Sequence, residues 1–467
     1  MRTSHATARH AGRVFEDLGH SLRVALGSLD MLPADGLLSV SLPLTEIAMG
    51  PYLPDRDAGY YWSRSSSGLT LLGTGTAARL VARGGARMEE LSQRFEETRS
   101  GWVRLGDADA PPPAAFLGFA FSADEEPGPE WCGLANSELV VPELLYRRSG
   151  DRAWLTFTAP AARIPDLRSL ERRWLRALDA LRAAQRAAGT LADEPAVLSR
   201  TEDGDWNAPF EQALDDIRRG RLQKVVLTRS VRYSASRALS WGRVLDALEP
   251  GHQECTRFAV ARPGFGLVGV SPERLVSLDG DVVVADALAG TAPRGATAPL
   301  DATLAARLKQ DPKALHEHRL VVDQIQRALE PCCRGLLAPQ APEIMSLPTV
   351  HHLWSPVGGH LRNGRNLLEL AERLHPTPAV GGSPREAALE WLASHEHRGR
   401  GWYTGAFGWL DAGGNGELSV VLRCGIINGK SVDLFAGAGI VADSRPDQEF
   451  AETEWKLCTM RGALELG

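Results

Sequence analysis

The sequence is poor in cysteine, and its few thiols lack the spacing of a disulfide framework or a metal site. Six cysteines lie among 467 residues, at positions 132, 255, 332, 333, 424 and 458, and none forms a CxxC pair. Adjacent cysteines such as Cys332 and Cys333 rarely pair with each other. The pattern argues against a disulfide scaffold and indicates idle thiols in a reducing cytoplasm.

Long apolar runs and a surplus of basic charge are also missing. No apolar stretch approaches 18 residues, so no membrane-spanning helix is predicted. The formal net charge of −6 does not favour nucleic acid or an anionic membrane as a partner. The first ten residues are basic but lack the apolar core of a secretion signal, and Glu16 and Asp17 argue against a transit peptide.

Two partial motifs for cofactors or zinc lack essential residues. The run at 72–77 has two glycines but not the third glycine of a dinucleotide fingerprint, so nicotinamide or flavin is not expected. The runs His316-Glu317-His318 and His395-Glu396-His397 differ from HExxH, and residues i and i+2 point to different sides of a helix. Zinc is therefore not predicted, and Glu317 is better interpreted as one oxygen ligand of Mg²⁺.

What is present predicts a large α+β architecture. With 43% hydrophobic residues the chain can bury a sizeable core. Asp279-Gly280 between two alternating stretches predicts a hairpin, and mixed strand pairs and long helices indicate mostly antiparallel sheets. The predicted strands are 116–121, 139–146, 154–157, 224–233, 265–270, 275–278, 281–287, 403–410, 417–427 and 431–435, and the predicted helices are 84–100, 166–188, 206–219, 304–329 and 445–465.

Residues 436–456 are the most informative stretch. A tight turn at Gly437 and Gly439 is predicted to lead into a helix, and its freed backbone N–H groups can face an anion. One face of that helix carries two carboxylates and one ammonium at i, i+3 and i+7: Glu449, Glu452 and Lys456. Carboxylates one turn apart suit a hard cation. The stretch predicts a Mg²⁺-bridged site for a small polycarboxylate.

Two residues have the chemistry of a base and an acid. Lys224 lies among Val and Leu on a predicted strand, sharing a face with Val226 and Thr228, and desolvation favours the neutral amine of a general base. Glu273 directly follows a strand, where burial can keep a carboxyl protonated as a general acid. The ordinary alternatives are a lysine reaching for solvent and a turn glutamate paired with Arg274.

Eight segments occur in an order that is specific, although no single one is. They are Lys-Val-Val-Leu-Thr-Arg (224–229), Ser-Pro-Glu-Arg-Leu (271–275), Leu-Ala-Gly-Thr-Ala-Pro-Arg (288–294), His-Glu-His-Arg-Leu-Val-Val (316–322), Leu-His-Pro-Thr-Pro-Ala-Val-Gly-Gly (374–382), Arg-Gly-Trp-Tyr-Thr-Gly (400–405), Val-Leu-Arg-Cys (421–424) and the stretch 436–456. Together they resemble the chorismate-binding enzymes, the family of isochorismate, salicylate, anthranilate and aminodeoxychorismate synthases.

The resemblance is strong over about 205–465 and looser before it. Residues 116–121 and 140–144 resemble the menaquinone-type isochorismate synthases, and the polar stretch 199–205 is the best linker candidate. We therefore expect a less specific N-terminal part at 1–200 and the chorismate-binding catalytic region at 201–467. The implied fold is that of anthranilate synthase component I, one large α+β domain of mostly antiparallel sheets packed as a sandwich with helices outside.

The implied reaction is that of isochorismate synthase, an isomerase. It converts chorismate to isochorismate with Mg²⁺, adding water at C2 and losing the C4 hydroxyl. The ammonia-using members lack a lysine at the position of Lys224, so this lysine argues for water. Ala314 departs from the acidic or amide residue that the family often has there, so a contact near the metal is missing or is supplied by His316.

The resemblance also implies site roles. Lys224 looks like the base that activates water, and Glu273 looks like the acid that protonates the departing hydroxyl. The implied Mg²⁺ ligands are Glu317, Glu449 and Glu452, of which Glu449 can act through water. The implied substrate contacts are Tyr403 and Arg423 at the enolpyruvyl carboxylate, Gly437, Gly439 and Lys456 at a carboxylate side, and Gly290, Thr291 and His352 in the pocket wall.

Two other functions stay open at this point. A salicylate synthase would use the same acid and base and then lose pyruvate, although residues 374–382 are closer to the isochorismate synthases. A non-catalytic chorismate-binding protein is disfavoured by the complete acid, base and metal set. No amidotransferase segment is present, and we expect a cytoplasmic monomer without an amidotransferase, nucleic-acid or membrane partner. The pathway, whether to menaquinone, a siderophore or another product, is not determined.

Overall fold

The computed structural model describes residues 18–29, 36–44, 49–54, 57–131, 133–164, 166–188, 195–202, 206–396 and 398–466. The basic first ten residues, Glu16 and Asp17, Cys132, His397 and the end of the predicted linker at 203–205 lie outside the described residues. No helix within the described residues combines the length and the apolar character needed to cross a membrane.

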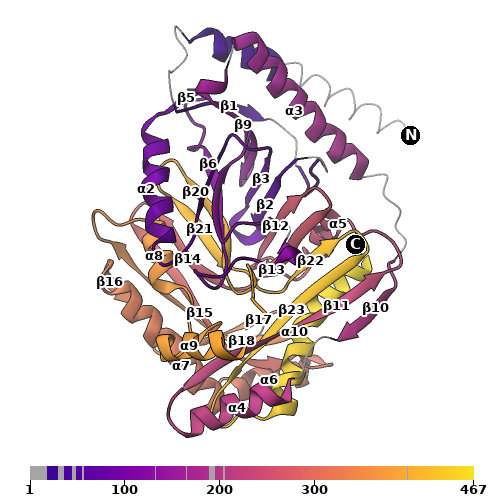
Figure 1. Ribbon diagram of the computed structural model, residues 1–467, viewed down its shortest axis with the longest axis vertical. Helices are drawn as coiled ribbons and strands as arrows, with labels where there is room; N and C mark the ends of the chain where they lie inside the picture. Colours follow the sequence, from indigo (N-terminus) through magenta and orange to yellow (C-terminus); the bar gives the residue numbers. More distant parts are fainter. Residues whose placement is uncertain are drawn as a thin grey trace.

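Two large sheets form the centre of the molecule (Figure 1). Of the described pairings, only that of β1 with β5 is parallel. The first sheet has 13 strands, in the order β10 (Leu198–Glu202), β11 (Lys224–Ala235), β23 (Ser431–Ile440), β22 (Cys424–Asn428), β13 (Phe265–Ser271), β12 (Thr256–Arg262), β2 (Gly59–Arg64), β3 (Leu69–Thr74), β8 (Leu144–Ser149), β9 (Arg152–Pro160), β1 (Leu37–Leu44) and β5 (Trp102–Gly106), with β19 (Gly382–Ser383) beside β11. The second sheet has 10 strands, in the order β16 (Cys333–Leu337), β18 (Val350–Leu361), β15 (Val282–Pro293), β14 (Arg274–Asp279), β21 (Gly416–Val420), β20 (Ala406–Asp411), β6 (Ala114–Phe119), β7 (Ser137–Val141) and β4 (Ala78–Ala82), with β17 (Glu343–Ser346) beside β18.

Aromatic side chains join the two sheets face to face. Phe116 of β6 stacks on Tyr60 of β2 at 5.1 Å and on Phe407 of β20 at 6.0 Å between ring centroids. These rings belong to a fully buried cluster that also contains Trp62 and Phe258. Because both sheets contribute large apolar residues to one layer, they pack as a sandwich, as predicted.

Helices cover the outside of the sandwich. On α3, Trp174 packs against Phe157 of β9, while α7 packs on β15 of the second sheet and α10 on β23 of the first (Figure 1). Residues 18–27 are also helical. The labelled helices are α2 (Arg87–Ser100), α3 (Leu167–Ala188), α4 (Asn207–Arg218), α5 (Trp241–Ala247), α6 (Ala298–Leu308), α7 (Pro312–Leu329), α8 (Leu367–Leu374), α9 (Arg385–His395) and α10 (Pro446–Leu466).

Strands from both sides of residue 200 share both sheets. In the first sheet β2 pairs with β12 over six residues, and in the second sheet β6 pairs with β20 over six residues. The predicted regions 1–200 and 201–467 are therefore interleaved in space. Their division stays a prediction about how specific each part of the sequence is.

Several predicted boundaries are wrong for local reasons. The predicted helix 304–329 is two helices, because the side chain of Asp311 caps a new helix by accepting from Lys313 N at 3.1 Å and Pro312 occupies its first turn. The predicted strand 139–146 is β7 and β8, separated at Pro142 and Glu143. The predicted strand 403–410 begins only at Ala406, and the predicted strand 417–427 is interrupted at Arg423, whose φ is 44°.

The predicted glycine turn before the last helix is also wrong. Gly437 and Gly439 lie inside β23, opposite Thr228 and Val226 of β11. Glycine at these positions leaves room for side chains to approach the strand closely, and the chain does not change direction there. The following helix, α10, is confirmed.

Candidate active site

A small cavity brings most of the predicted site residues together. It has a volume of about 60 Å³ and lies where the C-terminal strands of both sheets meet α7 and α10. Lys224 and Glu449 do not line it: Lys224 is paired with the lining residue Glu317, and Glu449 with Lys313. Eleven of the thirteen predicted residues line it: Glu273, Gly290, Thr291, Glu317, His352, Tyr403, Arg423, Gly437, Gly439, Glu452 and Lys456.

Lys224 is a buried cation at the start of β11. Its side chain is 1% exposed, and Nζ donates to Glu317 Oε1 at 2.7 Å. A lysine that reaches for solvent is therefore the wrong interpretation. Gly439 makes room for the pair, because a Cβ there would lie 2.7 Å from Glu317 Oε1 and 2.8 Å from Lys224 Cε. The absence of a side chain at 439 is thus a requirement of this contact.

Glu273 is a buried acid without a counter-ion of its own. Burial, followed by the charge of Asp286, raises its pKa to about 8, although nearby cations act in the opposite direction. Within the described residues Glu273 Oε1 has no hydrogen-bond partner. Arg274 points instead to Asp286 and Glu417, at 3.8 and 3.7 Å, so the predicted alternative of a Glu273–Arg274 pair is wrong. Glu273 is protonated at neutral pH.

Each predicted metal carboxylate is paired with a lysine. The sequence has five lysines in all, and three of them are used here. Burial would raise the pKa of Glu317, but the ammonium of Lys224 outweighs it and holds that pKa below its usual range. Burial raises the pKa of Glu449, with the charge of Glu452 adding to the effect. The three pairs are Lys224–Glu317 at 2.7 Å, Lys313–Glu449 at 2.6 Å and Lys456–Glu452 at 2.5 Å.

His352 orients the guanidinium group of Arg423. Its Nη2 lies 2.9 Å from His352 Nε2, and burial, with the charge of Arg423, lowers the pKa of His352 far below its ordinary value. A neutral His352 that accepts at Nε2 carries its proton on Nδ1, which lies 3.3 Å from Gly290 O and 3.1 Å from Thr291 Oγ1. Arg423 Nε has no partner within the described residues, so part of the guanidinium remains available to an anion.

Tyr403 and Lys456 meet at Gly437. The Tyr403 hydroxyl lies 3.4 Å from the position that a Cβ of Gly437 would take, and its ring stacks on Phe435 at 5.3 Å. Lys456 Nζ donates to Gly437 O at 2.8 Å. Gly437 therefore contributes space and a carbonyl acceptor, whereas the prediction had its backbone N–H facing an anion.

Ala314 packs closely against Gly290 of β15. Gly290, at φ 81°, approaches α7 so closely that a Cβ there would lie 3.1 Å from Ala314 Cβ. The contact therefore requires glycine at position 290. His316, predicted as one replacement contact, is exposed, and His318 on the opposite side bonds Ser355 at 2.9 Å. His316 and His318 therefore lie in different surroundings.

The comparison with known proteins decides the family. Residues 33–465 match the family described as chorismate binding enzyme. The chain belongs to this family. Isochorismate synthase MenF of Bacillus subtilis is 33% identical over 87% of this chain and 87% of its own length. The salicylate biosynthesis isochorismate synthase of Pseudomonas aeruginosa is 35% identical over 94% of this chain and 92% of its own.

A solved structure confirms the fold. The menaquinone-specific isochorismate synthase MenF of Escherichia coli superposes with a TM-score of 0.79, covering 97% of this chain and 99% of that chain at 24% identity. The predicted α+β sandwich is thereby confirmed. The family match and the relatives named above confirm the prediction of an enzyme.

Sequence reasoning missed one residue that organises the site of this family member. Arg400 is 3% exposed and donates to both carboxylate oxygens of Glu396 at 2.7 Å. It also donates to Val226 O at 2.8 Å and Val380 O at 2.7 Å, and both valines line the small cavity. Arg400 is therefore a positioning residue that ties β11 to the loop after α8. Its only signal in the sequence was membership of the 400–405 segment.

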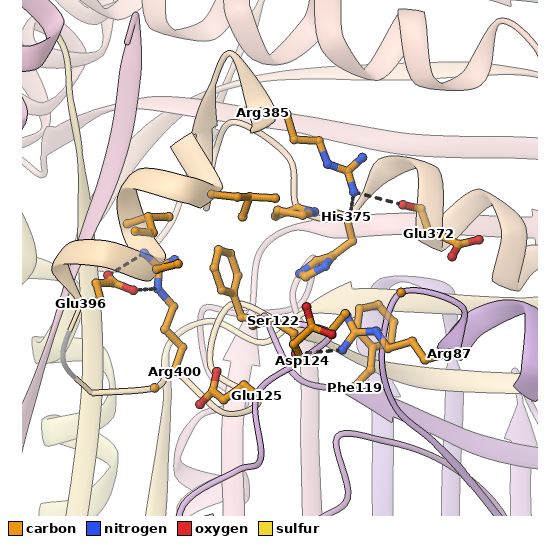
Figure 2. A pocket seen from close by; sticks show the side chains of 18 of the residues that line it. Arg87, Phe119, Ser122, Asp124, Glu125, Glu372, His375, Arg385, Glu396 and Arg400 are labelled. Atoms are coloured by element: carbon orange, nitrogen blue, oxygen red, sulfur yellow. Dashed lines mark hydrogen bonds and ion pairs between the residues drawn. The ribbon is translucent and has the colours of Figure 1, made fainter. Parts of the chain in front are cut away.

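A larger cavity lies beside the site but holds none of the thirteen predicted residues. It measures about 710 Å³, and Figure 2 shows Arg400 paired with Glu396 at one side and Arg385 near His375 at another. His375 Nε2 bonds Thr404 O at 2.8 Å, and burial lowers its pKa to about 3. The predicted acid, base and carboxylates all gather at the small cavity, so we place the candidate active site there.

Proposed function

We propose that this protein is an isochorismate synthase, an isomerase that converts chorismate to isochorismate with Mg²⁺. The observation that carries the proposal is one cavity lined by Glu273, a buried acid with a raised pKa, and by Glu317, the partner of the buried Lys224. Water is a poor nucleophile and hydroxide a poor leaving group, so this exchange needs both a base and an acid. The names of the relatives from Bacillus subtilis and Pseudomonas aeruginosa support the same reaction.

The acid and base divide the reaction between them. To act as the base, Lys224 would first give up the proton that its ammonium donates to Glu317. The neutral amine would then take a proton from the water that attacks C2 of chorismate. Glu273 would give its proton to the C4 hydroxyl, which leaves as water while the ring double bonds shift. One water enters and one leaves, so substrate and product are isomers. Lys224 ends the turnover protonated and Glu273 ionised, and proton exchange with solvent restores both.

The dianionic substrate would be held by cations of the cavity wall. Arg423 and Lys456 are both directed into this cavity, and Arg423 is held by His352. Buried guanidinium and ammonium groups bind carboxylates strongly because little water competes. The Tyr403 hydroxyl and the wall at Gly290 and Thr291 would complete the contacts.

The donor set fits a divalent cation in its chemistry. No three His, Cys, Asp or Glu side chains of the described residues are already arranged as a metal site. Yet the charges of Glu317, Glu449 and Glu452 all act on the single ammonium of Lys313, so this cluster already holds a cation. Carboxylate oxygens are the ligands that Mg²⁺ prefers. Bound there, Mg²⁺ would supply positive charge to a substrate carboxylate.

The cellular setting is a further part of the proposal. It includes a monomer that needs no amidotransferase subunit, because the lysine at position 224 argues for water rather than ammonia as the nucleophile. The five described cysteines are free thiols, and four are buried, which supports a reducing cytoplasm. Menaquinone and siderophore pathways both remain consistent with an isochorismate product.

One incubation tests the reaction. Purified protein with chorismate and Mg²⁺ is expected to yield isochorismate, separated by liquid chromatography. Salicylate and pyruvate appearing without a second enzyme would overturn the proposal in favour of a salicylate synthase. Binding of chorismate without turnover would indicate the non-catalytic alternative.

A further inference from the structure

The ammonium group of Lys313 lies at the edge of the proposed metal site. Lys313 lies in the first turn of α7, one turn before Glu317. Its Nζ donates to Glu449 Oε1 of α10 at 2.6 Å, and the Glu449 side chain is only 4% exposed. The charges of Glu317 and Glu452 also act on this ammonium. One lysine therefore lies among carboxylates from two helices.

The charges of the cluster are already balanced. Three lysines face three carboxylates, so a divalent cation that enters alone adds two uncompensated positive charges in a buried region. Such an excess is costly where the effective dielectric constant is low. Unless a second anion enters with the metal, at least one ammonium has to withdraw.

Lys313 is the lysine best able to withdraw. The Lys224 side chain is 1% exposed and that of Lys456 is 15% exposed, and Lys456 is also bonded to Gly437 O. The Lys313 side chain is 29% exposed, and the one acceptor of its ammonium among the described residues is Glu449. It does not line the substrate cavity. Its long stem can turn into water without vacating a buried position.

We propose that Lys313 competes with the divalent cation for the carboxylates of this site. Its ammonium neutralises Glu449 until a metal displaces it, and so Lys313 sets the metal concentration at which the site fills. The inference rests on the proposed metal role of Glu317, Glu449 and Glu452. It adds that the site is tuned against tight metal binding in the absence of substrate.

The test is a metal titration of the full chain without chorismate. Mn²⁺ serves as the probe, because free and bound Mn²⁺ are distinguished by electron paramagnetic resonance, and Mg²⁺ is titrated by calorimetry. Lys313→Met is expected to bind both ions about tenfold more tightly or better than the unaltered chain. The matched control is Lys309→Met, at an exposed lysine just after α6, which is expected to leave affinity unchanged. Equal or weaker metal affinity in folded Lys313→Met would overturn the proposal.

Two further measurements keep the proposal open to refutation. In metal-free buffer Lys313→Met is expected to melt at a lower temperature than the unaltered chain, with Mg²⁺ restoring the loss, because Glu449 has lost its counter-ion. A loss that Mg²⁺ does not restore would make Lys313 a merely structural residue. If Lys313→Met does not fold, Lys313→Gln replaces it with the same expected gain in affinity. Lys313→Arg, which keeps the charge, is expected to show no gain.

The outcome is separable from that of the proposed reaction. Metal affinity is measured without substrate, and product is measured on the unaltered chain. Isochorismate formation together with unchanged metal affinity in Lys313→Met refutes the role of Lys313 alone. Tighter metal binding in that variant, without isochorismate formation by the unaltered chain, refutes the reaction alone.

Discussion

Two neighbouring cavities of this protein contain similar residue types. They differ in whether the buried polar atoms of those residues have hydrogen-bond partners. In the cavity of about 710 Å³, Arg385 donates to three backbone carbonyls and Arg400 is engaged by Glu396. None of its lining residues has a buried side-chain nitrogen or oxygen without a partner among the described residues. In the cavity of about 60 Å³, Glu273 Oε1 and Arg423 Nε have none. Unsatisfied buried polar atoms, rather than volume, therefore indicate the chemistry.

The largest effect is expected at the proposed base. Lys224→Ala removes the amine that donates to Glu317, and turnover should fall on the order of 10⁴-fold while chorismate binding stays measurable. The rate is followed as isochorismate formation, and binding is followed by calorimetry. The control is Lys430→Ala at an exposed lysine, which should keep full activity. Retained turnover in Lys224→Ala would remove it as the base.

Replacing one glutamate in each cavity by glutamine compares the two cavities directly. Glu273→Gln keeps the shape but loses the transferable proton, so kcat should fall about 10²–10⁴-fold. Glu372→Gln makes the same change in the larger cavity and should alter kcat by less than about twofold. Both are measured at saturating Mg²⁺. A comparable loss in both variants would show that the contrast between the cavities is misplaced.

Variants of the proposed metal carboxylates should change the Mg²⁺ concentration that the reaction requires. Glu452→Gln removes one charge from the cluster that Lys313 and Lys456 neutralise, and the Mg²⁺ concentration for half-maximal rate should rise about tenfold or more. Glu454→Gln, on the same helix but paired with Arg200, is the control and should leave that concentration unchanged. An unchanged Mg²⁺ titration in Glu452→Gln would exclude it from the metal site.

The smallest effect is expected in the pH at which kcat/KM begins to decline. Glu273 donates only while protonated, and its pKa is raised to about 8, so kcat/KM should decline above about pH 8, approaching tenfold per pH unit. Asp286→Asn removes a charge that raises this pKa and should move the decline to lower pH. The comparison is read from initial rates between pH 6 and pH 10. A decline that stays in place in Asp286→Asn would assign it to another group.

Chemistry that depends on residue type was largely accessible from the sequence. The family resemblance named thirteen residues, twelve of them within the eight ordered segments, and the structure places eleven of the thirteen around one cavity. Lys224 is paired with one of the lining residues, Glu317. Burial of Glu273 follows from its position after an apolar strand. The roles of these residues remain predictions until the variants are measured.

Features that depend on distant contacts were not accessible. Lys313 pairs with Glu449, which is 136 residues away, and nothing local marks it. Gly437 and Gly439 predict a turn from the sequence, because the space that Lys224 and Glu317 occupy beside Gly439 is visible only in three dimensions. The helix break at Asp311 and Pro312 did have a local signal, in a cap residue followed by proline, which the apolar periodicity across 304–329 obscured.

The interleaving of early and late strands has a practical consequence for any attempt to divide the chain. A fragment that began at residue 201 would leave β12 without β2 and β20 without β6, opening a strand edge in each sheet. Open edges beside an apolar layer invite pairing between molecules. Recombinant production of the catalytic region by itself should give aggregates, whereas co-expression of both fragments offers each edge its native neighbour.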